Sequence, residues 1–345
     1  MFPISAADSV SPAIQRTKEL LFRPFQWGPY LKLGLVAIIT EGIGNHFRSS
    51  EHGGHGTGPE SIGFSPSSLR PEWIAVIVAA ALVVLVLSIV VFYLITRLRF
   101  TFFHCLIHNV KQLRPGWQLY GAQAMRFFWL NVVVGLCFML LAGLIVLPFA
   151  AGFWRVFQET QEGGQPDVLS VLALVLPLIP IILLLALAGI VTDLILRDGM
   201  LPHFALENAT AGEAWAQVWS RIKAEKRQFA VYALLRVVLP MIALIGLFFL
   251  LLLPGLGLAA ALASVEFAVH SIFADATGAS VFVGVLLKIF FGVVAFVFAV
   301  LASICIGGPV STAIREYALI FYGGRYRALG DILYPPTPPP AIAMQ

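Results

Sequence analysis

The sequence predicts an all-α membrane protein, a bundle of helices that crosses the bilayer several times. Of the 345 residues, 59% are hydrophobic and only 12% are charged, whereas a soluble domain carries about 25% charged residues. The apolar residues also gather in uninterrupted runs of about 20 residues or more, the length that crosses a hydrocarbon core as a helix. Because these runs do not alternate between apolar and polar residues, they indicate helices rather than the strands of a barrel.

Five of the apolar runs are clear and a sixth is marginal. The marginal run covers residues 27–43 and contains Lys32 and Glu41. Lys and Arg concentrate in the cytoplasmic loops of membrane proteins, and alternate segments here hold 17 basic residues against 3 if all six runs cross. The sequence therefore predicts six spans with both termini in the cytoplasm. The five clear runs are residues 73–95, 128–150, 169–196, 231–253 and 280–306.

Three amphipathic segments on the predicted cytoplasmic side are expected to form helices in the headgroup layer. They cover residues 11–25, 115–128 and 210–229. In the third, Thr210 and Glu213 have the spacing of a capping box. Its apolar face and basic margin suit a surface of anionic lipid. We expect six residues of this segment to contact lipid: Trp215, Trp219, Arg221, Lys223, Lys226 and Arg227.

A short motif that occurs twice indicates an internal repeat. The sequences HCLIHN at 104–109 and HFALEN at 203–208 share the pattern H-x-x-[I/L]-x-N. The simplest interpretation is a parallel unit of an interfacial helix and a helical hairpin used three times, although the third copy lacks the His and the Asn. Parallel repeats occur in transporters, but they also build other membrane bundles. The predicted organisation is an interfacial helix at 1–26, a membrane domain at 27–322 with repeats near 11–110, 115–208 and 210–322, and a Pro-rich disordered tail at 323–345.

Histidines gather in two places where a metal could bind. The outward loop at 44–72 contains His46, His52 and His55, whose imidazoles could ligate zinc or copper. Its Gly-rich backbone does not fix ligands in space, so a solvated loop is the favoured interpretation. His104 and His108 lie one helical turn apart, and here the polar face of an interfacial helix is favoured over a metal or haem pair. The sequence predicts no cofactor.

Polar and charged residues inside the predicted spans are functional candidates, because burying them in hydrocarbon is costly. The strongest transport candidate is Lys288, about two turns from the outer end of its span. Arg236 is close enough to the cytoplasmic end to snorkel. Asp193 precedes Arg197 by four residues, which predicts an ion pair along the helix. The complete set is Glu41, which is expected near the outer end of its short span, Asn131, Asp193, Arg236 and Lys288.

Three stretches carry a resemblance to a known group. They are LLFRPFQWGPYLKLGLVAI near the N-terminus, the RxxFTFFHCLIHN segment that ends at residue 109, and GPVSTAIREYALIFYGG at 308–324. They resemble a loose group of uncharacterised bacterial six-helix membrane proteins, which is similar in layout to the membrane domain attached to some glycerophosphodiester phosphodiesterases. The resemblance implies a helical fold and the bacterial inner membrane. It implies no catalytic residue, because the phosphodiesterase's soluble domain and its motifs are absent.

Three classes of function remain open. A non-enzymatic scaffold or complex subunit, binding membrane lipids or a protein partner through its cytoplasmic helices, is favoured. A permease or channel subunit that uses the repeat interface and Lys288 is the alternative. An enzyme is the weakest interpretation, because no motif supplies a nucleophile, a base and an electrophile together. The net charge of +4 suits anionic lipid rather than nucleic acid.

Overall fold

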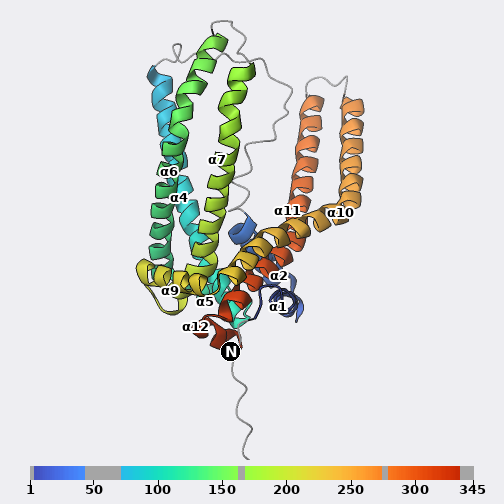
Figure 1. The fold of residues 1–345 in the computed structure, drawn as a ribbon. Helices are drawn as coiled ribbons and strands as arrows, with labels where there is room; N and C mark the ends of the chain where they lie inside the picture. Colours follow the sequence, from blue (N-terminus) through green and yellow to red (C-terminus); the bar gives the residue numbers. More distant parts are fainter. Residues whose placement is uncertain (1–3, 43–70, 162–167, 274–278, 335–345) are drawn as a thin grey trace, which may run out of the picture. The chain divides into compact units, whose positions relative to one another are not determined.

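The computed structural model describes residues 4–42, 71–161, 168–273 and 279–334, and every regular element in these ranges is helical (Figure 1). The all-α prediction is therefore confirmed. The chain divides into two units, which are described separately below. Unit 1 comprises Met1–Leu85, Thr101–Trp117 and Arg227–Gln345, and unit 2 comprises Val86–Phe100 and Gln118–Lys226.

Helix α11 (Ala279–Gly323) is the central element of unit 1. It packs against α1 (Val10–Phe22), against α2 (Trp27–Ala37) with its π-helical extension η1 (Ile38–Gly42), and against α12 (Arg327–Leu333). The helix α1 buries one stripe formed by Ala13, Thr17, Leu20 and Leu21, the spacing of an amphipathic helix that rests on a core. Residue 323, where the disordered tail was expected to begin, is followed by α12, whose Leu329 and Leu333 are buried.

A contact between two glycines brings α2 and α11 together. A Cβ atom added to Gly308 would lie 2.7 Å from the Cα atom of Gly34, so this position has no room for a side chain, and a Cβ atom added to Gly34 would lie 3.2 Å from atoms of Ile304. Beside this contact, the Tyr30 hydroxyl donates a hydrogen bond of 2.6 Å to the carbonyl oxygen of Cys305. The contacts follow the same order along both helices, from Tyr30 and Cys305 to Gly34 and Gly308. Small residues thus allow two backbones to pack at close range in an apolar setting.

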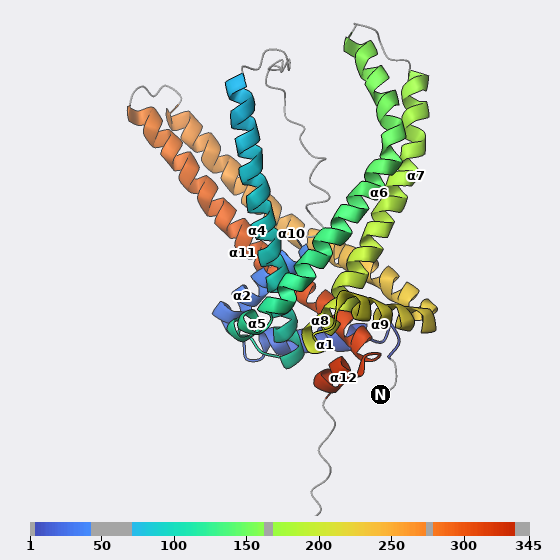
Figure 2. The same ribbon diagram turned by 90° about the vertical axis from the view of Figure 1, so that its left-hand side faces the viewer.

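The longest helix, α10 (Lys226–Phe273), forms a hairpin with α11 in unit 1 (Figures 1 and 2). The apolar run predicted at 231–253 is only part of this helix, because α10 continues through Pro254 to Phe273. The stretch after the proline is rich in Ala and Leu, which favour helix. With 48 residues, α10 is about 72 Å long, more than twice the thickness of a hydrocarbon core.

Unit 2 is built on a second hairpin, formed by α6 (Gly121–Gln161) and α7 (Val168–Leu194) (Figure 2). The chain continues through a π-helical segment, η3 (Ile195–Met200), into α8 (Leu201–Leu206) and α9 (Ala211–Ala224). At the base of the hairpin the Phe127 ring makes edge-on contacts with Phe100 and Phe204. These aromatic contacts join part of α4 and the short helix α8 to the hairpin.

Five helical stretches in the described residues are long and apolar enough to cross a membrane. They belong to α4 (Pro71–His108), α6, α7 with η3 and α8, α10, and α11. This result identifies a multi-pass membrane protein. The marginal run at 27–43 is not among the five, because α2 with η1 is short.

Candidate functional site

A buried cluster of charges in unit 1 brings together two residues that the sequence singled out separately. Glu41 in η1 accepts a hydrogen bond of 2.8 Å from the Nη2 atom of Arg236 in α10. The Nε atom of Arg315 in α11 lies 3.9 Å from the other carboxylate oxygen. Only 8% of the Glu41 side chain and 3% of the Arg315 side chain are exposed. Two arginines therefore neutralise one buried carboxylate.

This cluster relates two residues whose depths were predicted separately. The sequence interpretation placed Glu41 near the outer end of a span, and Arg236 near the cytoplasmic end of another. Paired side chains lie at the same depth, so the two statements cannot both hold. The cluster also includes Arg315, which lies eight residues before the end of α11 at Gly323. The conflict arose because each apolar run was judged without its partners.

A second buried ion pair in unit 1 was missed by the sequence analysis. The Nε atom of Arg16 in α1 lies 3.3 Å from Oε2 of Glu316, whose side chain is fully buried. The Arg16 guanidinium also donates to the carbonyl oxygens of Leu106 at the end of α4 and of Leu333 at the end of α12. One arginine thus connects four helices. The available signal was the adjacent Arg315 and Glu316 in an otherwise apolar stretch.

The remaining intramembrane candidates have local partners. Asn131 donates a hydrogen bond of 2.7 Å to the carbonyl oxygen of Phe127 in its own helix. Asp193 pairs with Arg197 at 3.2 Å, which confirms the predicted pair along the helix. The Lys288 ammonium lies 4.0 Å from the Glu266 carboxylate across the α10–α11 hairpin.

No cluster of three potential metal ligands occurs among the residues that the structure describes. His46, His52 and His55 lie outside those residues. His104 and His108 stack with ring centroids 4.4 Å apart, and the Nδ1 atom of His108 lies 3.2 Å from the carbonyl oxygen of His104.

In unit 2, the predicted capping box begins helix α9. The Glu213 amide donates to the Thr210 hydroxyl at 3.4 Å, and the Thr210 amide donates to the Glu213 carboxylate at 2.9 Å. These hydrogen bonds lower the pKa of Glu213, because they stabilise its ionised form. The preceding turn contains Asn208, which has a φ of 52°, and Asn109 of the matching motif has a φ of 53°. The repeated Asn thus ends a helix in the left-handed conformation, which Asn tolerates well.

The two sides of α9 differ sharply. Ala214 and Val218 are buried against the rest of unit 2. Trp215 and Trp219 are 46% and 42% exposed, yet their rings stack with centroids 5.8 Å apart. The Lys223 ammonium lies 5.5 Å from the centre of the Trp219 ring, a cation–π contact. Three of the six residues that we expected to contact lipid thus form one exposed surface on α9, here called the tryptophan face (Trp215, Trp219 and Lys223).

The other three expected residues have different positions. The Nη1 atom of Arg221 lies 2.9 Å from Nε2 of His203, whose side chain is fully buried. Arg221 therefore points into the protein rather than toward lipid, because α9 turns that side onto α8. On its other ring nitrogen, His203 lies 3.2 Å from the Glu207 carboxylate. Lys226 and Arg227 are exposed at the start of α10.

One protein-family model matches the chain over residues 4–332, a family of unknown function designated DUF7544. The chain belongs to this family. The match includes residues of both units and all the helices described above except the last residue of α12, so the buried charge cluster and the tryptophan face lie within the DUF7544 region. Neither the curated proteins nor the solved structures contain a significant match to the chain.

Proposed function

We propose that this protein is a non-enzymatic membrane scaffold or complex subunit, which binds anionic lipid or a partner protein at the cytoplasmic surface. The tryptophan face carries this proposal. Trp side chains prefer the boundary between hydrocarbon and water, and an amphipathic helix with such residues and a lysine at their edge suits the headgroup layer. The proposed location, from the sequence resemblance, is the bacterial inner membrane.

Six crossings with both termini in the cytoplasm remain our proposed topology. Arg16 contacts Leu106 near the C-terminal end of α4. Since α4 has 38 residues and is about 57 Å long, Pro71 at its other end belongs on the opposite side of the bilayer. The chain would then cross once more before α4, in addition to the five long helices, and our proposal assigns this crossing to the run at 27–43. The contact of Arg16 with Leu333 supports placing the C-terminal helix beside the N-terminal one.

The repeat interpretation gains support from local structure. Both copies of the His–Asn motif end a long helical stretch in a left-handed Asn, and an interfacial helix follows each: α5 (Arg114–Leu119) after Asn109 and α9 after Asn208. We infer that the motif marks the point where a membrane helix turns into the headgroup plane. The similarity in layout to the phosphodiesterase membrane domain remains an expectation from the sequence alone.

The permease alternative has less support. Its main candidate, Lys288, has a carboxylate partner in the same hairpin, and Glu41 is held by two arginines. A flux assay in proteoliposomes separates the two classes: a permease that uses Lys288 loses flux in the Lys288→Ala variant, whereas a scaffold has no flux to lose.

The proposed function is tested by counting the lipids that the protein retains. The purified protein is exchanged into nanodiscs of phosphatidylcholine with phosphatidylglycerol, and native mass spectrometry records the phosphatidylglycerol retained after release. We expect a double Trp215→Ala, Trp219→Ala variant to retain less. The control is Trp129→Ala, which removes an even more exposed Trp, 60% against 46% and 42%, from the apolar part of α6. Equal retention by the double variant and the wild type would refute lipid binding by α9.

A further inference from the structure

The exposed side of α1 in unit 1 continues directly into an exposed aromatic corner. The rings of Phe22, Phe25 and Trp27 are 45%, 44% and 63% exposed. They nevertheless pack on one another, with 6.2 Å between the centroids of Phe22 and Phe25 and 5.0 Å between those of Phe25 and Trp27. The Lys111 ammonium donates a hydrogen bond of 2.6 Å to the carbonyl oxygen of Pro24, which holds the corner in place.

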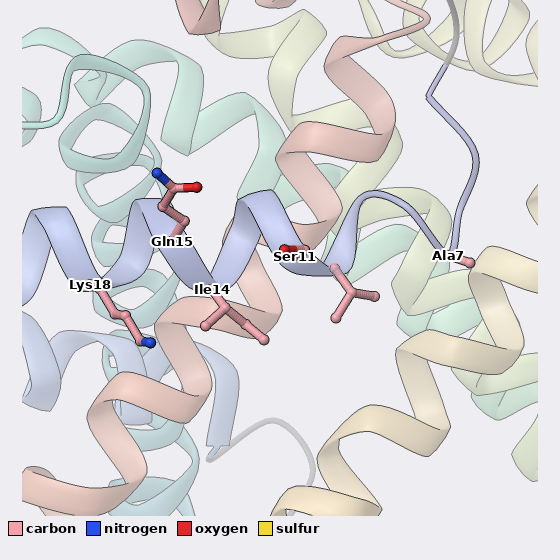
Figure 3. A pocket seen from close by; sticks show the side chains of 6 residues that line it. Ala7, Ser11, Ile14, Gln15 and Lys18 are labelled. Atoms are coloured by element: carbon pink, nitrogen blue, oxygen red, sulfur yellow. The ribbon is translucent and has the colours of Figure 1, made fainter.

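A hollow of about 510 Å³ lies along the same side of α1 (Figure 3). Its lining is chemically mixed, because Ala7, Val10 and Ile14 are apolar whereas Ser11, Gln15 and Lys18 carry hydrogen-bond donors. The side chains of Ile14 and Lys18 point to one side of the helix and that of Gln15 to the other (Figure 3). Because the lining residues recur every three or four positions, the hollow follows the helix axis.

The charges around this surface favour an anionic occupant. Lys18, Arg23 and Lys32 are exposed near the corner, and Lys111 adds a fourth cation. The exposed acids of the same segment are Asp8 and Glu19. Exposed aromatic rings among basic side chains, next to a helix that enters the apolar core, are typical of contact with anionic headgroups.

We propose that the hollow and the aromatic corner together bind an anionic phospholipid of the adjacent leaflet. The phosphate would accept a hydrogen bond from Lys18, the glycerol and upper acyl carbons would pack on the neighbouring Val10 and Ile14, and the corner would enter the headgroup layer. This inference deepens the proposed function by naming a second lipid site, and it depends on other residues than the tryptophan face.

Lipid retention tests the site directly. The full-length protein is placed in nanodiscs of phosphatidylcholine and phosphatidylglycerol, and native mass spectrometry compares Lys18→Ala with the wild type. We expect about fivefold weaker retention of phosphatidylglycerol, the effect of one basic residue near an anionic surface. The control, Arg327→Ala, removes an exposed cation of α12 that lies off this surface, and it should retain phosphatidylglycerol as the wild type does. Equal retention by Lys18→Ala and Arg327→Ala would overturn the proposal.

Two further measurements separate this site from the tryptophan face. Trp27 is kept as the only tryptophan by replacing the other six with Phe, and its fluorescence is recorded in vesicles of brominated phosphatidylcholine. Strong quenching of the Trp27 fluorescence is expected if the corner enters the bilayer. An unquenched Trp27, or a dimer whose interface covers this surface, would refute the site. Lys18→Ala is also combined with the double tryptophan variant. Additive losses of retained phosphatidylglycerol support two sites. A loss caused only by the tryptophan changes refutes this inference, whereas a loss caused only by Lys18→Ala refutes lipid binding by α9.

Discussion

Replacing Gly308 by Ala should separate α2 from α11. The added Cβ atom would lie 2.7 Å from the Cα atom of Gly34, whereas carbon atoms in contact normally lie about 3.5–4.0 Å apart. The obstacle is backbone, which cannot rotate away, so the two helices must move apart by about 1 Å. Such overpacking costs about 1–3 kcal/mol, partly offset by about 1 kcal/mol because Ala favours helix over Gly.

The matched control removes that offset from the comparison. Gly292 lies in the same helix, and an added Cβ atom there has nothing within 4 Å, so Gly292→Ala gains helix propensity without a clash. Thermal denaturation in detergent, followed by size-exclusion chromatography of the remaining folded protein, gives the midpoint of each variant. We expect Gly308→Ala to denature several degrees below Gly292→Ala. Equal midpoints would show that the glycine contact does not hold α2 in place.

Two other predictions concern the charge cluster and the cap of α9. Replacing Glu41 by Gln removes the buried carboxylate partner of Arg236, and we expect the free energy of unfolding to fall by about 3 kcal/mol. The control is Glu266→Gln, which breaks a largely exposed pair and should cost under about 1 kcal/mol. Similar midpoints of thermal denaturation for the two variants would contradict the burial argument. The pKa of Glu213 is lowered in the folded state, so its stabilisation of the first turn of α9 is present above its ordinary pKa and is lost as the pH falls through the lower, folded pKa. The rate of amide hydrogen exchange in that turn, with labelling times corrected for pH, should increase at acidic pH in the wild type but change little in Thr210→Ala. The same pH dependence in both proteins would show that the cap does not cause it.

The sequence predicted features that depend on local pattern. Apolar runs of sufficient length identified the five membrane helices, and the spacing of Thr210 and Glu213 identified the cap of α9. The position of the tryptophan pair followed from the same helical period. In each case the determining residues lie within one helix, so no knowledge of tertiary packing was needed.

Features that depend on which helices meet could not be predicted in this way. Glu41 and Arg236 are 195 residues apart in the chain, and each was judged from its own span. The charge count predicted that the run at 27–43 crosses the membrane, but it could not reveal that α2 packs along α11. Arg221 was assigned to lipid because its side of α9 is polar in sequence, whereas that side covers the buried His203.

The packing of α1 and α2 on α11 has a consequence for biosynthesis. Arg16 and Gly34 are made well before their partners Glu316 and Gly308, which lie 300 and 274 residues later in the chain. Contacts between such distant parts of a chain form slowly, and N-terminal segments emerge first during synthesis. We therefore expect α1 and α2 to remain without their partners until α11 has been synthesised, and a chain truncated before α11 to be recognised by quality-control proteases.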